Sequence, residues 1–159
     1  MSPLKYLVIY SSLFVALVLM ILPLPDWAQI YRPNWMALVM IYWSMALPKS
    51  VGLWFAFLCG IILDTSLGTL LGQHTLALVL IIAINMNFYL RIRVLAMAQQ
   101  VIYVFVLLLI NQAVVAWVEG FLGRSTPLLA FFSAPFIGML FWPWVFVVLR
   151  DIRRKAMLG

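Results

Sequence analysis

The sequence has few charged side chains. Only 9% of its 159 residues are charged, whereas 67% are hydrophobic, and the mean hydropathy is +1.16. A soluble domain carries about 25% charged residues. The chain therefore has too few polar side chains to form a water-facing surface, and we expect a multi-pass membrane protein.

Residues that usually build catalytic or metal sites are scarce. There is one histidine, His74, one cysteine, Cys59, and four acidic residues in all. A single cysteine excludes an intrachain disulfide, and one histidine with one cysteine cannot form a histidine–cysteine metal site. The chain also lacks a His-Glu-x-x-His motif, a Gly-x-Ser-x-Gly motif and a Gly-rich phosphate loop. We expect no catalytic residue, no metal and no cofactor.

Six apolar runs predict six transmembrane helices in one all-α domain that covers residues 1–159. A spanning helix needs about 20 mostly apolar residues. The predicted ranges are 4–22, 33–47, 50–64, 75–90, 97–118 and 127–149. The first run lacks a small-residue cleavage site before Asp26, so it is interpreted as a retained helix.

The net charge of +6 comes from basic residues that lie between or beyond the apolar runs. No exposed segment carries a basic face with interleaved aromatics, so nucleic-acid binding is not expected. With six helices and a cytoplasmic N-terminus, both termini are cytoplasmic. Eight basic residues then face the cytoplasm, and only Arg32 and Arg124 face the other side, as the positive-inside rule requires. The eight are Lys5, Lys49, Arg91, Arg93, Arg150, Arg153, Arg154 and Lys155. They are also expected to contact anionic lipid.

The second and third helices are predicted to be short. About 15 residues span roughly 22 Å, less than the ~30 Å hydrocarbon thickness. The segment "ALPKSVG" leaves almost no loop between them, so we expect a tight antiparallel hairpin. Local thinning, burial in the bundle or a re-entrant chain near Asp64 would accommodate the short helices.

Asp64 is the most unusual polar residue, because it follows a long apolar run. Gly60, Asp64, Gly68 and Gly72 are spaced by four and would share one face of a continuing helix, where small residues allow close packing. If the helix instead breaks near Asp64, the glycines serve a turn. The carboxylate is expected to cap a helix or form an ion pair, ahead of binding a ligand.

A second polar cluster is "YRPNW", residues 31–35. Arg32 is predicted to lie near the same end of adjacent helices as Asp64. It could pair with Asp64 or anchor the chain in the lipid headgroups. Asn34 stands at the entry of the second helix, and these residues join Asp64 and the glycines as a structural cluster or ligand pocket.

Further polar and aromatic residues are candidate partner contacts. Asn111 and Gln112 lie in the middle of the fifth helix, where they could form interhelical hydrogen bonds. In "FWPWVF", Pro143 lies inside the last helix and predicts a kink, around which Trp142 and Trp144 pack.

The quoted segments carry a family resemblance. "RPNW", "YWSMALP" at 42–48, "GIILD" with "GTLLG", and the closing "WPW" before a basic tail resemble MreD, the rod shape-determining membrane protein family. The resemblance implies a non-enzymatic inner-membrane subunit of the bacterial cell-elongation complex that supports peptidoglycan synthesis. It implies binding to MreC, with MreB, RodA and a class B penicillin-binding protein around them.

Two alternative functions stay open at this point. The fold implied by the resemblance is similar to substrate-capture subunits of energy-coupling factor transporters, so the chain could capture a vitamin. It could also be an intramembrane lipid-handling protein that uses Asp64. A capture subunit should copurify with a vitamin and an ATPase module, whereas a scaffold should copurify with MreC.

Overall fold

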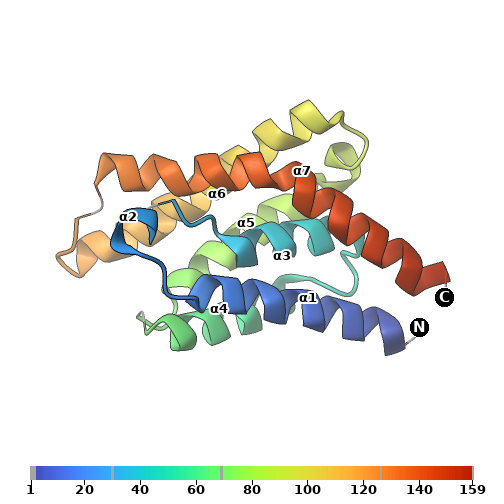
Figure 1. Ribbon diagram of the computed structural model, residues 1–159, viewed down its shortest axis with the longest axis horizontal. Helices are drawn as coiled ribbons and strands as arrows, with labels where there is room; N and C mark the ends of the chain where they lie inside the picture. The colour runs from blue at the N-terminus through green and yellow to red at the C-terminus, as the bar shows by residue number, and fades with distance from the viewer. Residues whose placement is uncertain (1–2, 30, 69, 126, 159) are drawn as a thin grey trace.

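The structure is a computed structural model that describes residues 3–29, 31–68, 70–125 and 127–158, and it is all-helical within these ranges (Figure 1). The helices are α1 (Pro3–Ile21), α2 (Asp26–Gln29), α3 (Trp35–Ala46), α4 (Leu53–Leu67), α5 (Gln73–Ile92), α6 (Met97–Phe121) and α7 (Leu128–Leu158). The six predicted ranges correspond to α1 and to α3 through α7, and the short α2 is an addition. Four of these helices, α1, α5, α6 and residues 131–156 of α7, are long and apolar enough to cross a membrane.

The centre of the fold is α3. Every residue from Met36 to Met45 is buried, and the helix packs against α1, α5, α6 and α7. A helix that is apolar on all sides is stable only when its whole circumference is covered. With 12 residues, α3 is about 18 Å long and too short to span the bilayer alone. Burial in the bundle is therefore how this short helix is accommodated.

A small set of hydrogen bonds ties α3 to its neighbours. Asn85 on α5 donates from Nδ2 to the Ile41 carbonyl (3.1 Å) and to Ser44 Oγ (2.6 Å), and Tyr103 on α6 donates to Asn85 Oδ1 (2.9 Å). On the other side, Trp43 Nε1 donates to Ser12 Oγ on α1 (2.8 Å). Such bonds average about 0.6 kcal/mol in membranes, so their main effect is to set the register of helices that apolar packing alone would leave free to slide.

The prediction that the second and third helices, α3 and α4, form a tight antiparallel hairpin is wrong. The connection between α3 and α4 is short, but α4 packs chiefly against α5. The reason is Gly60: a Cβ at this position would lie 2.4 Å from Thr75 Cα. The missing side chain allows the α4 backbone to approach the start of α5 more closely than any other residue would.

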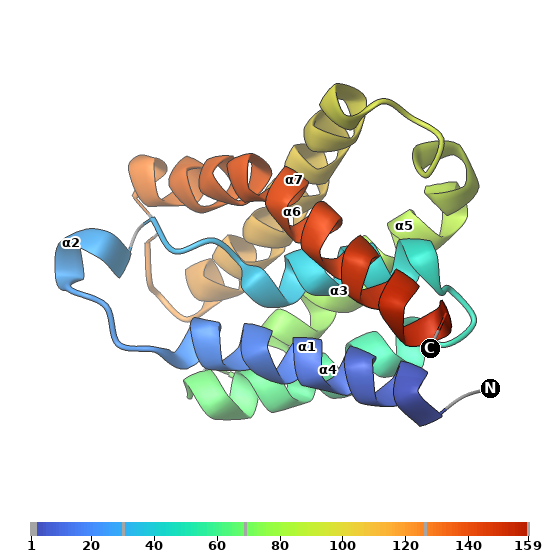
Figure 2. The same cartoon turned by 45° about the vertical axis from the view of Figure 1, so that its right-hand side comes forward.

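The last helix is longer than predicted. It continues to Leu158 instead of ending near 149, so the basic tail is helical. Leu149 and Ala156 are buried, so the apolar face of the helix continues into the basic tail. Basic side chains also stabilise the C-terminal end of a helix through its dipole. The helix changes direction partway along its length (Figure 2), and two prolines that can kink a helix, Pro135 and Pro143, lie inside it.

The start of α1 and the end of α7 lie at the same end of the bundle (Figure 1). Lys5 on α1, Leu47 after α3, and Arg153 and Ala156 on α7 line one small cavity there. The opposite end holds the α4–α5 turn and the α6–α7 connection, which Gln73 joins by donating from Nε2 to Glu119 Oε1 (2.8 Å).

The close approach at Gly60 gives a prediction. Gly60→Ala should destabilise the protein by about 1–3 kcal/mol, because the added methyl group meets backbone atoms of α5. Gly120→Ala is the matched control: nothing lies within 4 Å of its Cβ position, and alanine favours a helix by roughly 0.5–1 kcal/mol. Thermal unfolding in detergent measures both. Equal stability of the two variants would contradict the proposed α4–α5 contact.

Candidate functional site

Asp64 is fully buried at the end of α4, and its carboxylate faces the first turn of α5. Oδ2 accepts hydrogen bonds from the backbone N–H groups of Gly72 (3.0 Å) and Thr75 (3.2 Å) and from Thr75 Oγ1 (2.9 Å). Oδ1 accepts from the His74 N–H (2.9 Å) and lies 2.8 Å from His74 Nδ1. The carboxylate therefore caps α5 from a neighbouring helix.

The cap is needed because Gly72 occupies the N-cap position of α5 and has no side chain to offer. The first N–H groups of a helix have no partner within it, and a carboxylate beside them also interacts favourably with the helix dipole. In lipid no water replaces such a partner. Asp64 supplies the oxygen atoms that a capping Asp at position 72 would otherwise provide.

Of the two arrangements left open for the glycines, the structure has the turn and not the shared helical face. α4 ends at Leu67, and Gly68 and Gly72 have φ values of 69° and 103° in the turn that follows. This backbone conformation favours glycine because it has no Cβ. Gly60 is covered by α5. Gly60 thus serves internal packing, and Gly68 and Gly72 serve the turn.

Arg32 serves the end of α1. Its two Nη atoms donate to the carbonyl oxygens of Met20 and Leu22, which have no partner within the helix. Of the two roles left open for Arg32, pairing with Asp64 is therefore not formed: the guanidinium caps α1, and the carboxylate caps α5. Asn34 caps a third helix, because its Oδ1 accepts a hydrogen bond from the Ala37 N–H at the start of α3 (3.1 Å). The polar cluster is a set of helix caps at one end of the bundle.

The predicted partner contacts lie in different environments. Trp142 is fully buried and Asn111 is 3% exposed, so neither side chain can contact a partner in this conformation. Gln112 and Pro143 are half-buried. Trp144, by contrast, is 73% exposed on α7. Trp142, a predicted partner contact, is thus part of the buried core.

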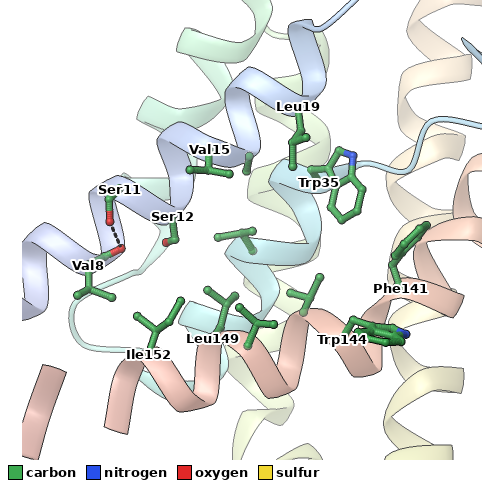
Figure 3. Close-up of a pocket in the computed structure, with 14 residues that line it drawn as sticks. Val8, Ser11, Ser12, Val15, Leu19, Trp35, Phe141, Trp144, Leu149 and Ile152 are labelled. Carbon is green, nitrogen blue, oxygen red and sulfur yellow. Dashed lines mark hydrogen bonds between the residues drawn. The ribbon is translucent and has the colours of Figure 1, made fainter. Parts of the chain in front are cut away.

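Trp144 stands at the edge of an apolar groove that the sequence analysis missed. The groove lies between α1 and α7 over α3 and encloses about 450 Å³ (Figure 3). It is lined by side chains of all three helices, including Ser11, Ser12, Val15, Trp35, Trp144 and Ile152. Ser11 Oγ donates to the Val8 carbonyl of its own helix (3.0 Å), so the wall is almost free of available polar groups. Two adjacent serines in an apolar helix were the only signal in the sequence.

The described residues contain no group of three His, Cys, Asp or Glu side chains that could hold a metal ion. The most buried carboxylate, Asp64, is occupied by a helix terminus. What the structure offers is a bundle of apolar helices, capped at one end, with an apolar groove on its outer face. These features define a multi-pass membrane protein whose exposed surfaces suit contact with lipid or with other membrane helices.

The comparisons with known proteins agree with this class. The sequence profile of the family described as rod shape-determining protein MreD matches residues 1–152. A rod shape-determining protein MreD from Haemophilus influenzae is 34% identical over 155 residues, which cover 98% of this chain and 96% of the relative. No solved structure gives a significant match. The chain belongs to the MreD family and has a role in rod-shape determination, which confirms the resemblance in the sequence.

The capping role of Asp64 gives a second prediction. Asp64→Ala should lower the free energy of unfolding by about 3 kcal/mol or more, because several buried donors lose a charged acceptor. Asp26→Ala, which removes an exposed carboxylate, should change stability by less than about 0.5 kcal/mol. Denaturation in detergent compares the two. A small effect of Asp64→Ala would show that α5 does not depend on this cap.

Proposed function

We propose that this protein is a non-enzymatic inner-membrane subunit of the bacterial cell-elongation complex. It binds MreC within the membrane and acts beside MreB, RodA and a class B penicillin-binding protein to support peptidoglycan synthesis. Membership of the MreD family over nearly the whole chain carries this proposal.

The proposed topology has six membrane helices and both termini in the cytoplasm. It is supported by the position of the chain ends, because Lys5 on α1 and Arg153 on α7 line the same small cavity. Arg93 also lies beside Arg153, at another pocket. Basic groups from three parts of the chain thus gather at one end, and the positive-inside rule places this end in the cytoplasm.

The groove between α1 and α7 is the proposed MreC contact. Helix association in lipid depends on close packing, because apolar surface alone gives little driving force between helices. The groove has a volume of about 450 Å³, and a concave groove offers more contact area to a partner helix than a convex helix face does. The small side chains of Ser11 and Ser12 line the groove on the α1 side. The rigid Trp144 ring stands at its edge on the α7 side (Figure 3). Gly60 is less suited to this purpose, because the start of α5 covers it.

Reporter fusions test the topology. A reporter at Gly159 should be active in the cytoplasm, and a reporter inserted at Arg124 should be active only on the periplasmic side. The expected result follows because the C-terminal end of α7, which precedes residue 159, and Arg124 lie at opposite ends of the bundle (Figure 1). The same activity pattern for both fusions would reject the six-helix topology.

Copurification tests the MreC contact. Val15→Trp should reduce recovery of MreC about tenfold, because the indole fills the groove. Leu58→Trp is the matched control: both positions are 56% exposed, but Leu58 lies on α4 in a different groove, between α1 and α4. Membrane yield and thermal stability should be equal for the two variants. Full MreC recovery with Val15→Trp, or selective loss with Leu58→Trp, would reject this groove.

A further inference from the structure

A small pocket at the basic end of the bundle is separate from the proposed MreC groove. It encloses about 140 Å³ and lies where the last turn of α3 meets α7 and the connection after α5. Its walls are formed by Tyr42, Met45, Ala46, Arg93, Phe146 and Arg153. This space is large enough for several water molecules, and therefore for a phosphate group.

The side chain of Tyr42 indicates that the pocket binds a polar group. Tyr42 is 1% exposed, yet its hydroxyl group has no hydrogen-bond partner among the described residues. A buried donor without an acceptor is costly and uncommon in folded proteins. A ligand in the pocket that carries acceptor oxygens would satisfy the Tyr42 hydroxyl group.

The charges around Tyr42 select the sign of that ligand. Arg153, Arg150 and Arg154 act on the hydroxyl group with positive charge, and Asp151 acts with negative charge. The Arg153 guanidinium lies over the Tyr42 ring at 6.0 Å, and Arg93 adds a further cation at the pocket wall. Asp151 Oδ1 lies 3.7 Å from Arg150 Nε, and the C-terminus of α3 adds a partial negative charge. The positive guanidinium groups outnumber these two negative groups, so the pocket favours an anionic ligand.

We propose that this pocket binds the phosphate group of an anionic phospholipid. Guanidinium groups bind phosphate oxygens with two parallel hydrogen bonds, and a tyrosine hydroxyl adds a third donor. Met45 and Phe146 supply apolar walls beside the charged groups. The pocket also lies at the basic end of the bundle, beside the ends of α3 and α5, where a headgroup site is expected. Basic pockets between helices are typical headgroup sites. The proposal requires only a membrane protein, and it does not depend on MreC binding.

The test uses the full-length protein in nanodiscs of phosphatidylcholine, with or without phosphatidylglycerol. Thermal stability and the number of phosphatidylglycerol molecules retained in native mass spectrometry are measured. We expect phosphatidylglycerol to raise the melting temperature of the unmodified protein. Arg153→Gln and Arg93→Gln should each weaken retention about tenfold, as loss of a charge-assisted hydrogen bond predicts. Arg91→Gln and Lys155→Gln, which remove the same charge outside the pocket, should retain the lipid.

Tyr42→Phe separates lipid binding from folding. In phosphatidylcholine alone this variant should be at least as stable as the unmodified protein, because it removes a hydroxyl group that has no hydrogen-bond partner among the described residues. With phosphatidylglycerol it should lose most of the lipid-induced rise in melting temperature. Equal lipid retention by all variants, or equal losses with the control variants, would overturn the proposal. Stabilisation by inorganic phosphate without any preference for phosphatidylglycerol would overturn the lipid assignment in favour of free phosphate.

Discussion

Lipid cannot hydrogen-bond to the free ends of helices, and the fold depends on how the chain meets this constraint. Asp64 provides the acceptors for the first turn of α5 from the end of α4. The position of α5 in turn sets the rest of the bundle. Asn85 on α5 forms hydrogen bonds with α3 and with Tyr103 on α6. Gln73 at the start of α5 forms one with Glu119 at the far end of α6. One carboxylate thus fixes the helix on which the core is assembled.

The two ends of the bundle solve different problems. At the end that contains Asp64, the polar side chains of Arg32, Asn34 and Glu119 are used to cap helices or to join them. At the end that holds the start of α1 and the end of α7, basic side chains gather, and Tyr42 has a hydroxyl group with no hydrogen-bond partner among the described residues. The first end is closed by internal hydrogen bonds, whereas the second carries the groups that would receive an anionic ligand.

The alternative functions receive less support from the geometry. A lipid-handling site built on Asp64 needs an accessible carboxylate, but this one is 0% exposed and accepts hydrogen bonds from α5. A vitamin-capture site needs several convergent polar groups in a largely enclosed pocket. The groove between α1 and α7 is lined almost entirely by apolar side chains and lies on the outer face of the bundle (Figure 3). A membrane helix suits such a surface better than a polar small molecule.

The sequence by itself determined the class and the approximate helices, because composition and apolar run length are local properties of the chain, and its short motifs carried the resemblance to the family. It also marked Asp64 and the turn glycines as exceptional, and it left two roles open for the carboxylate. Only the tertiary structure decided which helix Asp64 caps, that Arg32 turns back to α1, and that α4 packs on α5. These outcomes depend on contacts between residues far apart in the chain, such as Gly60 with Thr75 and Tyr42 with Arg153. No local pattern specifies such contacts, because many neighbours could satisfy the same apolar face.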